Sequence, residues 1–223
     1  MSRTITYENI ISMSTRNNGS TKIIESVLEN PTLVTELINA MKTEKTSLKF
    51  SYEKILRSIS EDAPQLIYPY FEDFANLLDN DNNFIKWGVI ITIANLTVVD
   101  YKNKFIKLFK KYYAPVKGPV MITAANIIKS SWKIAIAKPE LADRIACEIL
   151  KVQSARYINH GQASPECKNI VCGHAIDSFS LFFDKIENMT PVFVFIKKQL
   201  KNSRPAVAKK AEKFLKKFER FKD

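Results

Sequence analysis

Residues 79–100, DNDNNFIKWGVIITIANLTVVD, decide the fold class, because a polar turn leads into sixteen mostly apolar residues, 84–99. Sixteen helical residues span about 24 Å at about 1.5 Å per residue, which is short of the roughly 30 Å hydrocarbon core of a bilayer. Lys86 and Asn95 add polar groups that are costly in lipid. We therefore expect this stretch to be buried in protein and not to cross a membrane.

Arranged as a helix, the stretch is apolar on two faces. One face carries Ile85, Val89, Ile93 and Leu96, and another carries Trp87, Ile91, Ala94 and Val98. A helix that is apolar over most of its circumference packs among other helices.

The same arrangement recurs along the chain. In each copy an apolar residue ends one helix, and another apolar residue, seven positions later, begins the next helix. The four copies pair Met41 with Leu48, Leu78 with Ile85, Tyr113 with Val120, and Leu200 with Val207. Apolar residues follow four and eight positions after each second member: Tyr52, Val89, Ala124 and Ala211, then Leu56, Ile93, Ile128 and Leu215. Such repeats cannot bury their apolar faces alone, so stacked neighbours must supply the core.

Prolines stand where the helices of these repeats should begin. Outer helices are expected to start at Pro31, Pro139 and Pro191, and inner helices at Pro119, Pro165 and Pro205. Proline is tolerated at the first helical position, because the N–H there has no intrahelical acceptor. In Ser164-Pro165-Glu166 the serine is expected to cap the helix. The polar segment 156–166, RYINHGQASPE, breaks the period and is expected to be an insertion loop.

Two segments, LLDNDNNFIKWGV (77–89) and QLKNSRPAVAKKAEKFL (199–215), resemble the HEAT repeat, and segments 37–56 and 111–128 are looser copies. This resemblance implies an all-α fold, a right-handed α–α superhelix (a HEAT-like solenoid) of about five helical pairs. Residues 1–30 would form an N-terminal cap region, and residues 31–223 the repeat array with its insertion near 156–166. An irregular all-helical bundle is the alternative.

Groups that could carry chemistry are sparse. Four potential zinc ligands lie within fifteen residues: His160, Cys167, Cys172 and His174. Cys167 and Cys172 diverge on a helix, so buried structural cysteines are expected instead of a zinc site. His174, Asp177 and Ser178 can touch on one helix, which we interpret as a polar seam. With no Gly-rich phosphate loop and no His-Glu-x-x-His sequence, we assign no catalytic residue, no cofactor and no metal.

A DNA-binding repair enzyme is the alternative function. The HEAT-like alkylpurine DNA glycosylases resemble this chain in length, basicity and helix content, and their site places an aspartate shortly after a tryptophan. Here GVIITIANL follows Trp87, and the next acid after Trp132 is Glu140. The glycosylase motif is therefore missing, and both tryptophans are expected in the core.

Charge is the strongest functional signal. The net charge of +11 is uneven: residues 23–82 carry −6, residues 84–118 carry +6 and residues 191–223 carry +8. In the helix expected over 100–113, Lys104, Lys107 and Lys111 share one face, opposite Phe105, Leu108, Phe109 and Tyr112. In the last repeat a similar stripe, Lys209, Lys213, Lys216 and Lys217, stands against Phe214, Phe218 and Phe221.

These two lysine stripes are the candidate partner-binding residues of a non-enzymatic scaffold protein. The partner is expected to be a protein or another macromolecule, acidic or polyanionic. Nucleic acid would be bound without sequence selectivity, because lysine lacks the planar fork of arginine. A solvated face and a polar end cap are the alternative explanation. Three cysteines make no disulfide framework, and the amino terminus has no apolar signal segment, so a cytoplasmic, non-membrane protein is expected.

Overall fold

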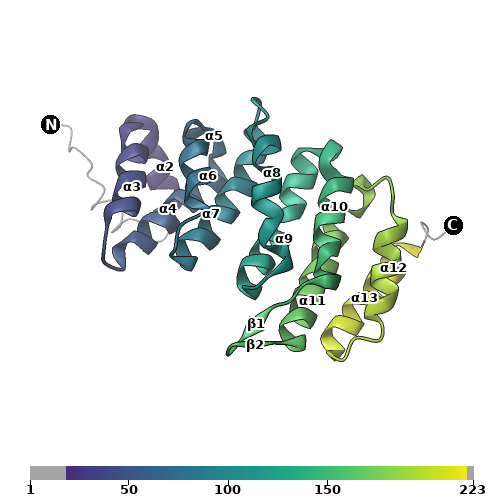
Figure 1. The fold of residues 1–223 in the computed structure, drawn as a ribbon. Helices are drawn as coiled ribbons and strands as arrows, with labels where there is room; N and C mark the ends of the chain where they lie inside the picture. The colour runs from purple at the N-terminus through teal and green to yellow at the C-terminus, as the bar shows by residue number, and fades with distance from the viewer. Residues whose placement is uncertain (1–18, 220–223) are drawn as a thin grey trace. The chain divides into compact units, whose positions relative to one another are not determined.

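A computed structural model of the 223-residue chain describes residues 19–219, with side chains from residue 22 onward. The chain divides into two compact units, Met1–Lys107 (unit 1) and Leu108–Asp223 (unit 2). Within the described residues the fold consists of α-helices, short 3₁₀ turns and one two-stranded hairpin, so the predicted all-α class is confirmed (Figure 1).

Unit 1 is a set of helices around α4 and α7. It contains α2 (Gly19–Glu29), α3 (Thr32–Thr43), α4 (Leu48–Asp62), α5 (Pro64–Ile67), η1 (Tyr68–Tyr70), α6 (Phe71–Leu77), α7 (Asn83–Leu96), η2 (Thr97–Val99) and the start of α8 (Lys104–Tyr113). Helix α4 packs against α3 and α7, and α6 also packs on α7. The side chain of Asn82 accepts hydrogen bonds from the N–H groups of Phe84 and Ile85, and these bonds cap α7 at the polar turn.

The apolar stretch is buried as predicted along one face, but not at its two ends, where Phe84 and Val98 are exposed. Ile85, Val89 and Ile93 are at most 2% exposed. Val98 is 66% exposed, because α7 ends at Leu96 and Val98 falls in the following 3₁₀ turn. The prediction that Val98 lines an apolar face is therefore wrong.

One boundary prediction is confirmed and another is corrected. Helix α4 begins at Leu48, as the repeat predicted, and this first residue is 44% exposed. The helix expected from Asp100 begins only at Lys104. Asn103 has a φ of 52°, which breaks helical geometry immediately before that residue.

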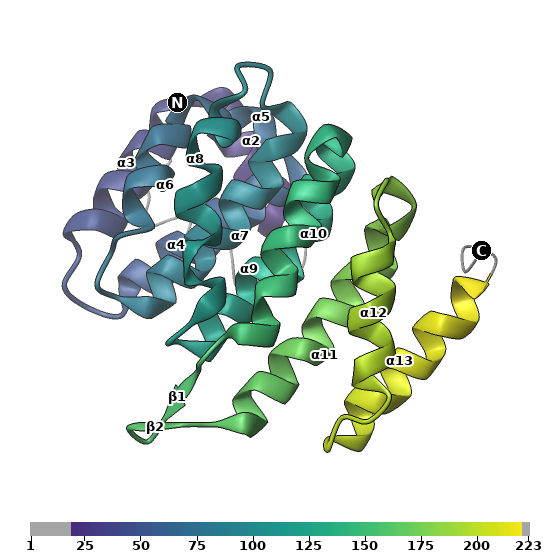
Figure 2. The same ribbon diagram turned by 45° about the vertical axis from the view of Figure 1, so that its right-hand side comes forward.

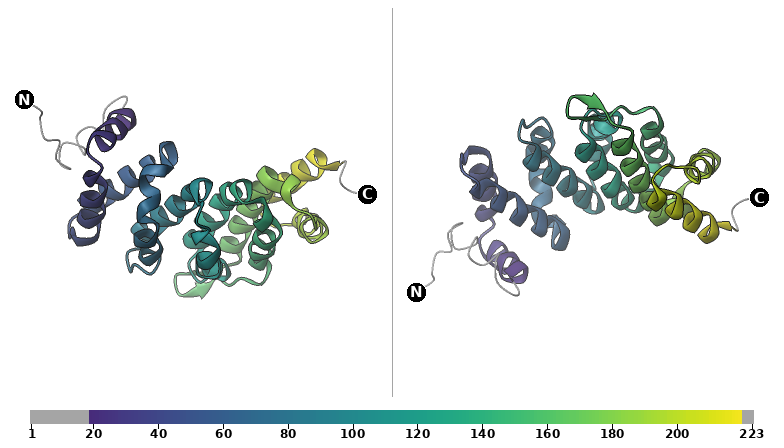
Figure 3. Two further views of the ribbon diagram at one scale, coloured as in Figure 1. Left: turned by 90° about the horizontal axis from the view of Figure 1, so that it is seen from above. Right: turned by 90° about the horizontal axis from the view of Figure 1, so that it is seen from below.

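Unit 2 is arranged around α11. It holds the rest of α8, then η3 (Ala114–Lys117), α9 (Met121–Ala137), η4 (Pro139–Leu141), α10 (Ala142–Leu150), η5 (Lys151–Ser154), α11 (Pro165–Phe182), η6 (Phe183–Lys185), α12 (Thr190–Gln199) and α13 (Pro205–Lys217). Helix α11 packs between α9 and α13, while α10 and α12 also contact it (Figures 2 and 3).

The predicted proline positions are confirmed in part: Pro31 is the residue just before α3, and Pro119 lies two residues before α9 and is not its first residue. Pro165 and Pro205 are the first residues of α11 and α13, Pro191 is in the first turn of α12, and Pro139 opens the 3₁₀ turn before α10. The Ser164 side chain accepts a hydrogen bond from the N–H of Cys167 at 3.2 Å, so the predicted cap of α11 is also confirmed.

The segment 156–166 contains a short hairpin. Strand β1 (Ile158–Asn159) pairs antiparallel with β2 (Gln162–Ala163). The turn residues His160 and Gly161 both have positive φ, as a type I′ turn requires. Ile158 donates its N–H to the Pro119 carbonyl at 2.9 Å, which places the entry to α11 beside the entry to α9. The division into a cap at 1–30 and an array at 31–223 stays a prediction, and residues 1–18 lie outside the described part of the chain.

Candidate binding surface

The buried carboxylate of Asp100 fixes where α8 begins. Its Oδ1 accepts hydrogen bonds from the Lys104 N–H at 2.8 Å and the Tyr68 hydroxyl at 2.7 Å, and its Oδ2 accepts one from the Phe105 N–H at 3.0 Å. These bonds satisfy backbone donors that the first turn of a helix leaves without partners. The sequence provides this cap in the Asp-Tyr-Lys-Asn segment that precedes α8.

Lys104, one of the predicted binding lysines, is engaged within unit 1. Its ammonium lies 3.4 Å from the Glu72 carboxylate and 5.5 and 5.7 Å from the ring centroids of Tyr68 and Phe71. Its side chain is only 23% exposed. A cation over aromatic rings contributes to packing, so Lys104 offers less to a partner than the sequence suggested.

The other two predicted binding lysines of α8 are exposed. Lys107 is the last residue of unit 1, and Lys111 lies in unit 2. The side chains on the opposite side of α8 are buried, as predicted: Phe105, Leu108, Phe109 and Tyr112.

Helix α13 carries the second predicted stripe. Its apolar side is buried through Val207, Ala211, Phe214 and Phe218, and the two phenylalanines pack against Phe183. All four predicted lysines are exposed: Lys209, Lys213, Lys216 and Lys217. The predicted contact of Phe221 lies outside the described residues.

The lysines of α13 form two sets on different sides of the helix. Lys210 forms an ion pair with Asp177 of α11, and Lys217 donates from Nζ to the Ser180 carbonyl of α11 at 2.8 Å. At about 100° per residue, Lys209 and Lys216 lie on the side of α13 that points away from these two contacts. A partner on α11 would therefore meet the first set and not the second.

A basic surface extends from α13 across α11 to α9. His174 of α11 is half-buried, and Lys129 of α9 and Lys210 of α13 are both near enough to act on its charge. Burial lowers the pKa of His174 most, both lysines lower it further, and Asp177 opposes them. We call this surface the central basic face and define it by Lys129, Lys133, His174, Lys210, Lys213 and Lys217.

The sequence interpretation missed four of these residues: Lys129, Lys133, His174 and Lys210. Lys129 and Lys133 are spaced i, i+4, which places them on one side of a helix and could have suggested a third basic stripe. No sequence pattern indicates that this stripe lies beside α13, because α11 comes between the two helices.

Unit 1 has an exposed cluster of aromatic side chains on α4 and α7. Phe84 is 65% exposed and packs edge to face on Phe50 and Trp87, with ring centroids 5.6 and 5.2 Å apart. The Lys49 ammonium lies 5.5 Å from the Phe50 ring. Trp87 is only half-buried, as is Trp132 in α9. The expectation that both tryptophans lie in the core is therefore only partly met.

The cysteine and histidine residues are consistent with a structural role. Cys167 and Cys172 are buried, and burial raises the pKa of the Cys172 thiol to about 11. A thiol with a raised pKa is a poor nucleophile and a poor metal ligand. Within residues 19–219 no three His, Cys, Asp or Glu side chains are grouped to hold a metal ion.

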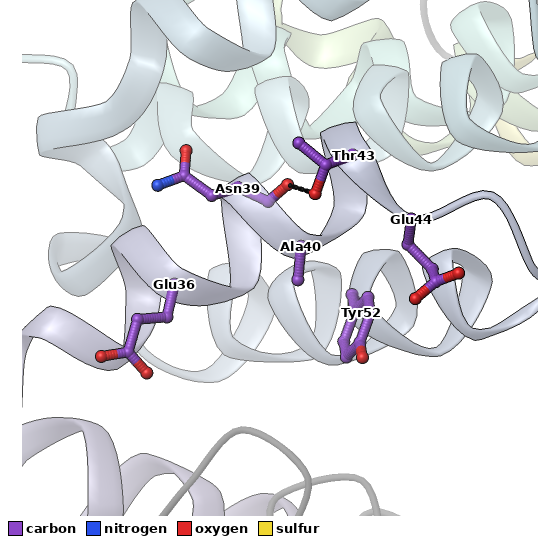
Figure 4. Close-up of a pocket in the computed structure, with 6 residues that line it drawn as sticks. All are labelled: Glu36, Asn39, Ala40, Thr43, Glu44 and Tyr52. Atoms are coloured by element: carbon purple, nitrogen blue, oxygen red, sulfur yellow. Dashed lines mark hydrogen bonds between the residues drawn. The ribbon is translucent and has the colours of Figure 1, made fainter.

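A shallow pocket of about 330 Å³ lies on unit 1 between α3 and α4 (Figure 4). Its lining is acidic and polar: Glu36, Asn39, Ala40, Thr43, Glu44 and Tyr52. The Thr43 hydroxyl donates to the Asn39 carbonyl at 2.9 Å. A hydrogen bond from the Thr46 N–H lowers the pKa of Glu44. The described lining therefore pairs carboxylates with neutral polar groups and holds no cation, histidine or cysteine.

No described helix combines the length and apolar character needed to cross a bilayer. No family model matches the chain, and neither does any curated protein. Among solved structures, the chain is similar to Pds5 in the Pds5–Scc1 complex, with a TM-score of 0.55 and 12% identity. The similarity covers 94% of this chain and 31% of that one, so this chain spans about a third of the length of Pds5. At this identity the likeness is one of fold, and it confirms the predicted HEAT-like class.

Proposed function

We propose that this chain is a non-enzymatic binding protein that presents a basic helical surface to an acidic macromolecular partner, most simply a protein. The supporting observation is the concentration of positive charge in one unit. Unit 2 contains 22 basic and 10 acidic side chains, a net charge of +12, whereas unit 1 contains 12 and 13, a net charge of −1.

Three further points support the proposal. Like charges at such density repel one another and lower the stability of the folded protein. An acidic ligand would reduce this repulsion when it binds. The predicted lysines Lys107, Lys111, Lys209, Lys213, Lys216 and Lys217 are exposed on helices whose other sides are buried. Pds5, which has a similar fold, was solved in complex with Scc1, a protein partner.

The test is to identify what co-purifies with the full chain from its source organism, using mass spectrometry for proteins and an absorbance ratio for nucleic acid. A variant with Lys210, Lys213 and Lys217 of α13 changed to glutamate should lose the partner. A matched control changes Lys197, Lys198 and Lys201, which are exposed on or just after α12, and alters the charge by the same amount. The control should keep the partner.

Two outcomes would contradict the proposal. Equal loss in both variants would mean that net charge, and not a surface, holds the partner. Release of free bases from alkylated DNA by the purified chain would favour the repair-enzyme alternative. If duplex DNA binds, its affinity should fall by about 0.9 log units per log unit of salt for each phosphate contact, with little sequence preference.

A further inference from the structure

We infer that the central basic face of unit 2 docks an extended acidic polypeptide segment that carries an apolar anchor residue. This inference rests on the proposed function and names the partner's chemistry and its site. It assigns the site to three helices, α9, α11 and α13, where the sequence pointed to α8 and α13.

The solvent side of each helix can be followed by its periodicity. On α9 one stripe of exposed or partly exposed residues consists of Ile122, Asn126, Lys129, Lys133 and Ile136. On α11 the corresponding stripe is Ile170, His174, Asp177 and Leu181, and on α13 it is Ala206, Lys210, Lys213 and Lys217. Steps of three and four residues keep a stripe on one face of a helix, so all three helices turn a defined row of side chains to solvent.

The rows of α11 and α13 lie side by side along their length. Glu166 pairs with Arg204 near the start, Asp177 pairs with Lys210 in the middle, and Lys217 bonds to the Ser180 carbonyl near the end. Because both residue numbers rise together, the two helices are parallel (Figure 2).

The row of α9 is in register with that of α11. Helices α9 and α11 pack against each other, the N–H of Ile158 in the hairpin before α11 bonds to the carbonyl of Pro119 just before α9, and Lys129 lies near enough to His174 to lower its pKa. Ile136 follows Lys129 by seven residues, and Leu181 follows His174 by seven residues. Seven residues span about 10 Å along a helix. They therefore fall at the same level.

The face thus has a cationic middle and, toward the C-terminal ends of α9 and α11, an apolar level. Ile136 is 47% exposed and Leu181 is 52% exposed, although both are aliphatic. An extended chain advances about 3.3 Å per residue, so three residues cover the distance between the two levels. In a segment with an acidic residue about three positions from an aliphatic or aromatic residue, the acid can contact the lysines while the apolar residue contacts Ile136 and Leu181.

A polypeptide fits this face better than nucleic acid does. Its cations are lysines, which act as point charges, and not arginines, which form planar contacts with phosphates and bases. The aliphatic end has no counterpart in a phosphate backbone but matches a hydrophobic side chain.

The experiment begins with display of a random-peptide library on the full chain. Enriched peptides should combine net negative charge with an apolar residue about three positions from an acid. Anisotropy of the best labelled peptide then compares three double variants. K129E with K210E should weaken binding by about tenfold or more, and I136S with L181S by about fivefold or more, since each removes one of the two levels.

The control is K209E with K216E, on the other side of α13, which changes the charge by the same amount and should stay within about twofold. K210E also removes the pairing of Lys210 with Asp177. K129A keeps that pair and should weaken binding in the same direction if K129E with K210E fails to fold.

Three results would overturn the inference: no enrichment of acidic peptides, equal loss in the control, or tighter binding of a single-stranded oligonucleotide of the same charge. Failure here is distinguishable from failure of the proposed function. A co-purifying partner whose binding is unaffected by K129E with K210E would sustain the proposed function and remove this site. A chain that binds no macromolecule would contradict both.

Discussion

The contact between α4 and α7 in unit 1 and that between α11 and α13 in unit 2 are built alike, but they treat a carboxylate in opposite ways. In each, a helical glycine faces the neighbouring helix. Gly88 of α7 faces Glu53 of α4, and Gly173 of α11 faces Val207 and Lys210 of α13.

In unit 1 the carboxylate lies inside the contact. The Glu53 side chain is 11% exposed and accepts a hydrogen bond from Nε of Arg57 on its own helix at 2.8 Å. A Cβ at Gly88 would lie 1.7 Å from Oε1 of Glu53, so the glycine makes room for the acid. In unit 2 the acid, Asp177, is 49% exposed and pairs across the contact with Lys210. The comparison teaches that the same close approach of helices can bury a charge or leave it where a ligand can reach it.

The largest expected effect comes from a second buried carboxylate in unit 1. Ile93 lies on α7 with Gly88 and is fully buried. Ile93→Asp should destabilise the protein by about 4 kcal/mol or more, because it places a carboxylate among fully buried apolar side chains. Urea unfolding followed by circular dichroism measures the loss. Val98→Asp, at a position 66% exposed, is the control and should be nearly neutral.

The next largest effect should come from Gly88→Ala, which places a methyl group on the buried carboxylate. Overpacking and displacement of the acid should cost about 2–4 kcal/mol. Adding Glu53→Ala should recover part of the loss, since the clash is then removed. Trp132→Phe leaves Trp87 on α7 as the fluorescent reporter of unit 1. Strictly additive losses in the double variant would mean that Glu53 is not what Gly88 accommodates.

A smaller effect is expected from pH. Burial raises the pKa of Glu53 more than Arg57 lowers it. The folded state therefore holds the proton more tightly than the unfolded state, and stability is lost as pH rises above the ordinary value of 4.5. Glu53→Gln should remove this dependence, so thermal melts between about pH 4 and about pH 7 should show wild type losing stability relative to the variant. Exposed Glu36→Gln is the control, and parallel pH curves for wild type and Glu53→Gln would refute the assignment.

The smallest effect should come from Gly173→Ala in unit 2. Its Cβ would lie 3.2 Å from a methyl group of Val207, which can adjust by a few tenths of an ångström. Alanine gains about 1 kcal/mol of helix propensity over glycine, which offsets the tight contact. The change in unfolding free energy should therefore stay within about 1 kcal/mol. A loss as large as that of Gly88→Ala would erase the difference between the two contacts.

The sequence by itself determined the helical class and most helix starts. The apolar stretch 84–99, the recurring seven-residue step and the prolines at 165, 191 and 205 act locally, through burial of a helix face and the geometry of the first turn. The buried side of α8 and the exposure of the lysines on α13 followed for the same reason, because periodicity fixes which residues share a face.

Only the tertiary structure decided which charges meet and which are buried. Glu53 stands in a sequence typical of a solvated helix, and it is buried because Gly88, thirty-five residues later, leaves space for it. Lys104 matches the exposed stripe by spacing, yet Glu72 and two aromatic rings engage it. Lys129, His174 and Lys210 are separated by forty-five and thirty-six residues, and they form one face because α9, α11 and α13 pack side by side. Such distances are set by helix packing, which no local pattern in the chain encodes.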